Sequence, residues 1–157
     1  MPESSAKRTP MVLDDVSKAI IEQLQQDGRR SYAAIGKVVG LSEAAVRQRV
    51  QRLIDGGVMQ VVAVTDPLQL GFTRQAMMGI RVSGDAARVA EVVGSIAAAD
   101  YVVFTAGAYD LLAEVVCEDD DDLIELGSRI RAIDGVQSVE TLVYLKLHKQ
   151  LYDWGTR

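Results

Sequence analysis

The hydrophobic periodicity of this chain changes near residue 58, and this change limits the possible folds more than any other feature. Up to Gly57, apolar residues recur every three or four positions, as they do on one face of an α-helix. Beyond that point, short runs with the pattern of β-strands alternate with two longer amphipathic stretches. The sequence therefore predicts an α+β protein with a helical first part and a mixed second part.

Three helices are expected in the first part. The first begins at residues 13–16 (LDDV), because acidic side chains are favourable at a helix N-terminus. The second has the sequence SYAAIGKVV, with Ser31 as its cap and Gly40 at its end. The third runs from the capping residue Ser42 to the glycine pair at 56–57.

The second and third helices, joined by a glycine-containing turn, predict a helix-turn-helix. Gly40 lies at the turn, where a left-handed residue is needed. Val46, Val50 and Leu53 are expected to face inward, which leaves an outward face rich in arginine and glutamine. Arginine can pair with guanine, glutamine with adenine, and either can hold phosphate. We therefore predict a winged-type helix-turn-helix DNA-binding domain in residues 11–60.

The candidate DNA contacts lie on or beside this outward face: Tyr32, Ser42, Arg47, Gln48, Arg49, Gln51 and Arg52. Ser42 and the amides of the first turn could hold a phosphate oxygen. Arg49 and Arg52 lie at the flanks of the face and could instead pair with Asp14, Asp15 or Asp55. The alternative for the whole helix is a solvated surface whose arginines only maintain solubility.

The charge distribution also indicates two modules with different partners. Residues 1–62 carry nine lysines and arginines against seven acids, and residues 63–157 carry eight against fifteen. The net charge of −5 would by itself argue against nucleic acid. Screening confines surface electrostatics to about 8–10 Å, so a locally basic module can still bind DNA.

The second part has the element order βαββαβ, which is typical of a ferredoxin-like domain. Residues 59–65 are expected to form a strand or hinge, and residues 61–73 a hinge or linker strand between the two domains. The expected strands are 75–83, 101–107, 111–117 and 135–149, and the expected helices are 85–98 and 118–133. We assign residues 74–157 to this domain and predict a disordered arm at residues 1–10.

Several functional classes are disfavoured. No apolar run reaches the roughly 18 residues of a membrane span, and the N-terminus has no apolar signal segment, so we expect a cytoplasmic protein. The single cysteine, Cys117, allows no disulfide within the chain and is expected to be a packed thiol. The acids at 118–122 could suggest a metal site, but a helix N-terminus explains them. No catalytic set, metal spacing or phosphate loop is found.

These blocks together resemble the Lrp/AsnC (feast/famine) family of transcription regulators over nearly the whole chain. Residues 13–59 look like the DNA-binding domain of that family, and DPLQLGF looks like its linker. GAYDLLAEV, followed by IRAIDGVQSVETLVYLK, looks like its C-terminal effector-sensing domain. Ala108 departs from the pattern, because an acidic or polar residue is common there, and this bears on the choice of effector.

The resemblance implies a regulator of amino-acid metabolism genes that binds double-stranded DNA and an amino acid or related small molecule, without a cofactor. It also implies a homodimer formed through the C-terminal sheet, assembling into tetramers or octamers. Carried over by motif, the effector residues are Gly107, Tyr109 and Asp110, with Thr141 on the last strand. Asp110 could pair with a ligand ammonium, and the amides around Gly107 could approach a carboxylate. The alternative is a hairpin turn whose tyrosine packs.

Two other functions stay open at this point. Haem-biosynthetic decarboxylases share the two-domain architecture, so a tetrapyrrole enzyme is one alternative. Such an enzyme needs histidines or other basic groups around its substrate, and the chain has one histidine. The second alternative is a ligand-binding interaction module that has lost DNA binding, against which the arginines of the third helix argue.

Overall fold

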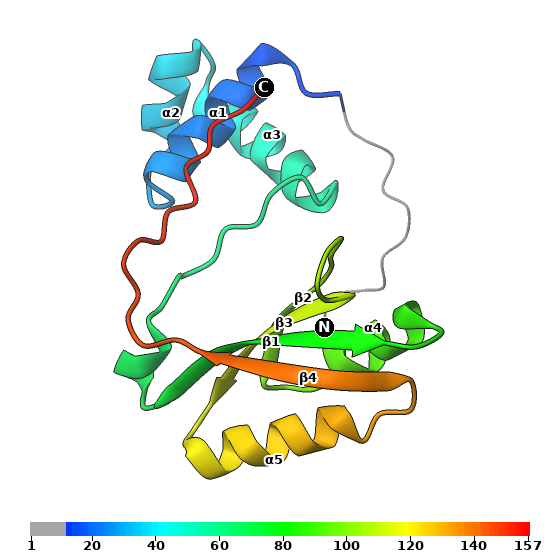
Figure 1. Ribbon diagram of the computed structural model, residues 1–157. Helices are drawn as coiled ribbons and strands as arrows, with labels where there is room; N and C mark the ends of the chain where they lie inside the picture. Colours follow the sequence, from blue (N-terminus) through cyan, green and yellow to red (C-terminus); the bar gives the residue numbers. More distant parts are fainter. Residues whose placement is uncertain (1–11) are drawn as a thin grey trace. The chain divides into compact units, whose positions relative to one another are not determined.

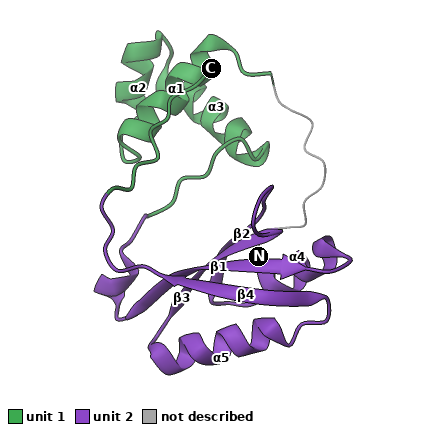
Figure 2. Cartoon of the chain, viewed as in Figure 1, with its two compact units in different colours: residues 1–63, 149–157 green, residues 64–148 purple. Residues whose placement is uncertain are grey.

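The computed structural model describes residues 12–157, and the chain divides into two compact units (Figure 2). Unit 1 comprises Met1–Ala63 and Lys149–Arg157, and unit 2 comprises Val64–His148. The predicted arm of residues 1–10 lies outside the described residues. The predicted C-terminal domain included residues 149–157, whereas the structure groups this tail with unit 1.

Unit 1 contains the three predicted helices, α1 (Asp15–Gln26), α2 (Tyr32–Val39) and α3 (Glu43–Asp55) (Figure 1). Each begins after a residue whose side-chain oxygen accepts a hydrogen bond from a backbone N–H three positions later. These caps are Asp14, Ser31 and Ser42, with distances of 2.8, 3.2 and 3.3 Å. The sequence located the helix starts correctly because capping depends only on neighbouring residues.

The turn between α2 and α3 depends on two glycines. Gly40 ends α2 in the left-handed region with φ of 72°, as predicted. Gly36, one turn earlier, lies so close to the following backbone that a Cβ there would be 2.4 Å from the carbonyl oxygen of Leu41. The tight turn lets Ile35 of α2 pack against Val46 of α3 in the core of unit 1.

Of the two possibilities predicted for residues 59–65, a strand or a hinge, the strand is not formed. Within the described residues, no strand lies between α3 and β1 (Arg74–Val82), and a short 3-10 helix, η1 (Pro67–Leu70), precedes β1. In its described residues, unit 1 is therefore a helix-turn-helix without the wing expected from the sequence. Val61 and Val64 are exposed, because a β-prone segment becomes a strand only when it can pair with another.

Unit 2 has the predicted βαββαβ order: β1, α4 (Ala86–Gly94), β2 (Ala99–Phe104), β3 (Leu111–Cys117), α5 (Asp120–Arg131) and β4 (Val136–Val143). The strand order in the sheet is β2-β3-β1-β4, and all neighbours are antiparallel. The last strand ends at Val143, six residues earlier than its predicted limit of 149, where its pairing with β1 ends at Ala76. No helix within residues 12–157 is long and apolar enough to cross a membrane.

The sheet has one covered and one open face. Ala76, Met78 and Ile80 of β1 are buried in a core that includes residues of α4 and α5 (Figure 1). Because side chains alternate along a strand, the intervening residues point away from the helices. We call this second side the open face; the register assigns to it Met77, Gly79, Arg81, Leu112, Glu114, Ser138, Glu140 and Leu142.

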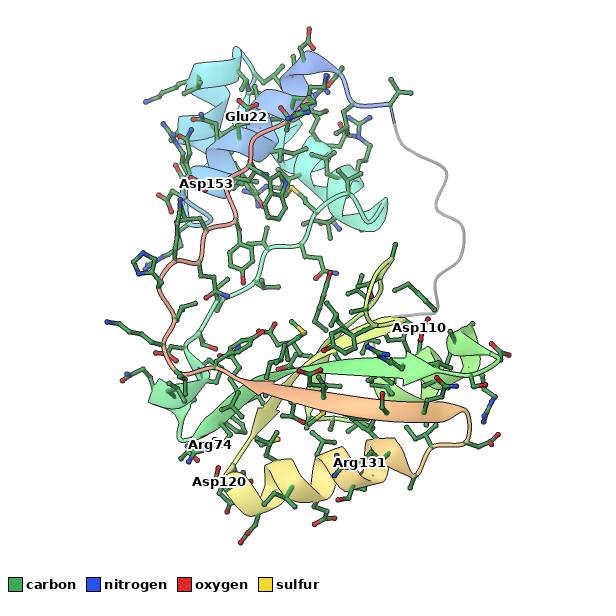
Figure 3. The ribbon with its side chains drawn as sticks, viewed as in Figure 1. Glu22, Arg74, Asp110, Asp120, Arg131 and Asp153 are labelled. Carbon is green, nitrogen blue, oxygen red and sulfur yellow. The ribbon has the colours of Figure 1, made fainter. Side chains whose placement is uncertain are left out.

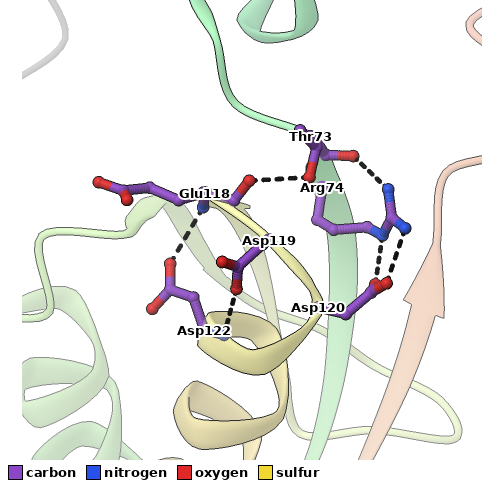
Figure 4. A network of polar contacts seen from close by, with 6 residues as sticks. All are labelled: Thr73, Arg74, Glu118, Asp119, Asp120 and Asp122. Carbon is purple, nitrogen blue, oxygen red and sulfur yellow. Dashed lines mark hydrogen bonds and ion pairs between the residues drawn. The ribbon is translucent and has the colours of Figure 1, made fainter.

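The acidic run at residues 118–122 forms the start of α5, as predicted. Asp119 caps the helix by accepting a hydrogen bond from the N–H of Asp122 at 2.9 Å. Arg74 of β1 pairs with Asp120, and its Nη2 lies 2.8 Å from Oδ2 (Figure 4). Asp122 in turn accepts a hydrogen bond from the N–H of Glu118. Of these acids, Asp120 therefore joins α5 to β1, while Asp119 and Asp122 stabilise the start of the helix.

Cys117, the last residue of β3, is buried in the core of unit 2. Burial raises the pKa of its thiol to about 11, because the thiolate loses hydration there. The residue is thus the packed, unreactive thiol expected from the sequence.

The tail belongs to unit 1 because it is hydrogen-bonded to α1. The N–H of Gly155 donates to Gln25 Oε1 at 3.1 Å, and Gln25 Nε2 donates to the carbonyl oxygen of Gly155 at 3.5 Å. Thr156 Oγ1 donates to Glu22 Oε1 at 2.5 Å; Glu22 is labelled in Figure 3. These bonds join residues about 130 positions apart in the sequence.

Replacing Gln25 by alanine should lower the free energy of unfolding of unit 1 by about 1 kcal/mol, the net contribution of an ordinary hydrogen bond. The tail should also become more sensitive to carboxypeptidase. Urea denaturation and timed digestion measure the two effects. Gln26→Ala, at an exposed neighbouring position, is the control. Equal behaviour of the two variants would show that the tail contributes no stability.

Candidate DNA interface and effector site

The outward face of α3 is defined by what the helix buries. Val46, Val50 and Leu53 are at most 2% exposed and pack within unit 1. This orientation leaves four of the candidate DNA contacts exposed on the helix: Arg47, Gln48, Gln51 and Arg52. We call these four residues the α3 face.

Arg47 is positioned by two neighbours. Its Nη2 lies 2.8 Å from Glu43 Oε1, one helical turn earlier, and its Cζ lies 5.2 Å from the ring centroid of Tyr32. The arginine side chain is 64% exposed, and an exposed ion pair of this kind contributes little stability. The guanidinium is therefore held in place yet remains accessible to a ligand. Tyr32 is half-buried at the start of α2 and serves as the platform for this arginine.

Arg49 differs from the other arginines of α3 because it has an internal partner. Its Nη1 lies 2.7 Å from Asp14 Oδ2 and 3.1 Å from Ser17 Oγ, and its side chain is only 26% exposed. Hydrogen bonds from Ser17, and then from Arg49, hold the pKa of the Asp14 carboxyl well below its usual range. Of the two possibilities open from the sequence, the structure thus gives Arg49 the intramolecular pairing, which joins α3 to the start of α1.

The remaining candidates have fewer restraints. Gln51 Nε2 donates to Asp55 Oδ1 at 2.8 Å, and Ser42 Oγ accepts the capping hydrogen bond at the start of α3. Arg52 forms no ion pair within residues 12–157. It lines a shallow hollow of about 260 Å³, together with Asp14 and Arg49.

In unit 2, the loop from Thr105 to Asp110 joins β2 to β3 in a fixed conformation. The N–H of Thr105 donates to the carbonyl oxygen of Asp110 at 3.0 Å, and Thr105 Oγ1 donates to the carbonyl oxygen of Tyr109 at 2.7 Å. Gly107 has φ of 152°, which L side chains rarely adopt. The loop brings three of the four predicted effector residues together, namely Gly107, Tyr109 and Asp110.

Tyr109 lies on the open face of the sheet. Its ring covers Gly79 so closely that a Cβ there would be 2.7 Å from Tyr109 Cε1. The phenol donates a hydrogen bond to Glu140 of β4, and this bond raises the pKa of Tyr109, with burial as the second cause. The Cζ of Arg81 lies 5.9 Å from the ring centroid. The tyrosine thus packs, as the hairpin alternative expected, but among charged groups.

Asp110 is engaged by the backbone of β1. Its Oδ2 accepts a hydrogen bond from the N–H of Val82 at 2.7 Å, and its own N–H donates to the carbonyl oxygen of Ile80 at 3.0 Å. The bonded N–H lies where the β1–β4 register shifts, between Arg81 and Val82 (Asp110 is labelled in Figure 3). The carboxylate therefore fixes the loop against the sheet.

Thr141, the fourth predicted effector residue, does not join this group. It pairs with Met78, whose side chain is buried on the helix-covered side of the sheet. Glu140, next to it in the chain, pairs with Gly79 and bonds to Tyr109 on the open face. Residues paired across an antiparallel sheet share a face, so the sheet separates Thr141 from Tyr109.

Three residues beside Tyr109 were not predicted from the sequence: Gly79, Arg81 and Glu140. One signal was present, because Gly79 and Arg81 are two positions apart and must share a face of the predicted strand. The register that places Glu140 opposite Gly79 has no local sequence signal.

A helix-turn-helix unit with an arginine-bearing third helix, joined to a separate βαββαβ domain, defines a two-domain DNA-binding regulator. Residues 13–54 match the AsnC-type helix-turn-helix domain, and residues 75–153 match the Lrp/AsnC ligand binding domain. The chain belongs to the Lrp/AsnC family of transcription regulators.

Individual relatives agree with this assignment. The chain is 32% identical over 143 residues to the HTH-type transcriptional regulator FL11 of Pyrococcus furiosus, covering 88% of this chain and 93% of the relative. It is 28% identical to the regulatory protein AsnC of Escherichia coli, covering 86% and 91%. The structure of E. coli AsnC matches with a TM-score of 0.75 over 90% of this chain and 98% of the other, at 26% identity. The leucine response regulatory protein LrpA of Mycobacterium tuberculosis matches with a TM-score of 0.79 over 88% and 96%, at 25% identity. The chain is thus a transcription regulator, and the enzyme alternative is set aside.

Asp14→Asn should reduce the stability of unit 1 at neutral pH. It should also make that stability change less as the pH is lowered. The folded-state pKa of Asp14 is lowered, so its contribution is present above the unfolded value near 4 and is lost as the pH falls through the folded value. Asparagine retains the helix cap but not the charge that pairs with Arg49. Denaturation between pH 7 and 2 measures the difference, with Asp15→Asn as control. Parallel pH profiles for wild type and Asp14→Asn would contradict this account.

Proposed function

We propose that this regulator acts as a homodimer that presents two α3 faces to successive major grooves of a pseudo-palindromic operator. The half-sites would be about 34–36 Å apart, or a multiple of that distance. The observation that carries the proposal is the exposed α3 face on a helix fixed by its cap and its buried valines. Phosphate contacts would supply most of the affinity, and base contacts the register.

Within this interface, Arg47 and Arg52 contact phosphate or guanine, and Gln48 and Gln51 contact bases or backbone. Ser42 and the first amides of α3 hold a phosphate oxygen, because a helix N-terminus favours negative charge. Tyr32 positions Arg47, because the guanidinium lies over the tyrosine ring. Arg49 is assigned to the interior of unit 1, since its charge is already paired with Asp14.

Dimerisation through the open face of the sheet is the second part of the proposal. Leu142 is 46% exposed there, and Met77 and Leu112 are half-buried, which leaves an apolar surface on one side of the sheet. The exposed valines near residues 61–64 add a segment that a second copy could cover. Dimers would then associate further into tetramers or octamers.

The third part of the proposal is that an amino acid or related small molecule binds near the 105–110 loop. The fixed loop supports this, as does the match of unit 2 to a ligand binding domain. A relative named for its response to leucine indicates the class of effector. Binding changes how dimers associate and therefore the spacing of their α3 helices, provided that the ligand distinguishes two assemblies. The regulated genes would be those of amino-acid metabolism, in the cytoplasm.

Arg52→Ala should weaken binding to operator DNA and reduce the slope of log affinity against log salt by about one, because one phosphate contact is lost. Stability and oligomer size should not change, since the side chain is exposed and outside the ion pairs of unit 1. Gel shifts at several salt concentrations, with sedimentation, measure both. Arg129→Ala on α5 is the matched control. If Arg52→Ala binds like wild type, Arg52 is not a contact.

An effector should change the gel shift of the wild-type protein on its own upstream DNA. Each of the twenty L-amino acids is added separately at millimolar concentration, and the affinity and the number of bound species are recorded. We expect one amino acid, or a chemically related few, to alter either quantity. If none of the twenty amino acids changes the affinity or the number of bound species, the proposed effector class is contradicted, while the DNA-binding function stands.

A further inference from the structure

Glu43, the first residue of α3, places an acid beside the residues proposed to contact DNA. Its side chain is 53% exposed, and Oε1 accepts a hydrogen bond from Arg47 Nη2 at 2.8 Å. Within residues 12–157, its Oε2 has no hydrogen-bond partner. Because a carboxylate repels phosphate, Glu43 weakens the attraction between α3 and DNA of any sequence. A contribution of Glu43 to DNA binding must therefore come from base recognition.

The position of Glu43 on the helix suits contact with bases. Residues one turn apart share a side of a helix, so Glu43, Arg47 and Gln51 form one ridge. Arg47 and Gln51 belong to the α3 face, and Glu43 continues that ridge to the start of the helix. In a helix-turn-helix, the N-terminal residues of the second helix contact base edges in the major groove. Glu43 is thus at the end of α3 that would enter the groove.

The ion pair with Glu43 also determines what Arg47 can recognise. Glu43 accepts one N–H of the guanidinium, whose Cζ lies 5.2 Å from the centroid of the Tyr32 ring. The remaining N–H groups can still form the paired hydrogen bonds that recognise guanine. The two opposite charges cancel, so the pair adds little to the attraction that DNA of every sequence shares. It is therefore suited to selectivity more than to affinity.

We propose that Glu43 is a specificity-determining residue, whose carboxylate accepts a hydrogen bond from the N4 amino group of a cytosine in the major groove. This assignment rests on the proposed binding of DNA by the α3 face and adds a base contact to it. Cytosine and adenine are the bases that present an amino donor in this groove. Adenine also presents the acceptor N7 beside its amino group, and N7 would repel the second oxygen of the carboxylate. Cytosine is therefore the base that fits.

An acid in the first turn of a helix has a simpler explanation, which is stabilisation by the helix dipole. Asp15 occupies the same place in α1 and is likewise exposed, but it lies outside α3. Asp15→Asn is therefore the matched control, because it removes a charge of the same sign from the first turn of a helix in the same unit. The proposed role requires that Glu43, unlike Asp15, sets a base preference.

The test starts from a pool of random-sequence DNA duplexes. Duplexes bound by the full-length wild type are selected and sequenced, and affinity is then measured for the consensus site and for each of its single base-pair variants. The same measurements are made with Glu43→Ala, Glu43→Gln and Asp15→Asn. Sedimentation checks that each variant keeps the oligomer size of the wild type.

Wild type and Asp15→Asn should prefer cytosine at one position of the half-site by about ten- to a hundredfold. Glu43→Ala should lose this preference, and Glu43→Gln should transfer it to adenine, with which a glutamine amide pairs. Both Glu43 variants should bind random-sequence DNA more tightly than wild type, because the charge that repels phosphate is removed. A residue that only stabilises the helix would change affinity without transferring a base preference.

Three results would overturn the inference while the DNA-binding function stands. The Glu43 variants could keep every base preference of the wild type, or lose a preference for a base other than cytosine. They could also lose preference equally at all positions, which would mark Glu43 as a residue that positions α3. If the wild type binds no duplex from the pool, the proposed function fails, and this inference fails with it.

Discussion

The register of β1 between β3 and β4 is the constraint on which unit 2 depends. Burying Ala76, Met78 and Ile80 beneath the helices forces Met77, Gly79 and Arg81 to the opposite side, since side chains alternate along a strand. A shift of one residue would exchange these sets and leave charge in the core. The register also brings Glu140 beside Gly79, and the bond from Val82 to Asp110 fixes the adjoining loop. One packing requirement therefore creates both the core and the polar group around Tyr109.

In unit 1, the main constraint is that the short helix α3 is held in place while its polar side stays exposed. The buried residues of α3 lie along one stripe, and the two helix-start serines and Gly40 fix how α2 and α3 meet. The arginines of α3 differ in their surroundings. Arg49 pairs with Asp14 and joins α3 to α1, whereas Arg47 and Arg52 stay exposed. The arginine that joins the helices and the exposed arginines, which we propose contact DNA, thus lie on different sides of one helix.

Several features followed from the sequence because their causes are local. Helix caps, the left-handed glycine and the βαββαβ order each depend on residues a few positions apart. Of the strand or hinge predicted at residues 59–65 the strand is not formed, and the last strand is shorter than predicted, for a shared reason: both segments have strand-like composition, but within the described chain their only backbone hydrogen bond to a strand is from the N–H of Tyr144 to the carbonyl oxygen of Gln75. Strand propensity is realised only where a neighbouring edge exists, and a single sequence does not show which edges are available.

The sequence by itself determined the class of protein, the positions of the helices and the inward face of α3, since periodicity and capping are properties of short segments. Only the tertiary structure decided which charged residues are partners. Arg49 meets Asp14 across 35 positions, Tyr109 meets Glu140 across 31, and the tail meets α1 across 130. It also placed Thr141 on the side of the sheet opposite Tyr109, although one motif-based prediction grouped the two residues. Such pairings depend on register and helix packing, which are set by the burial of the whole core and leave no local trace in the chain.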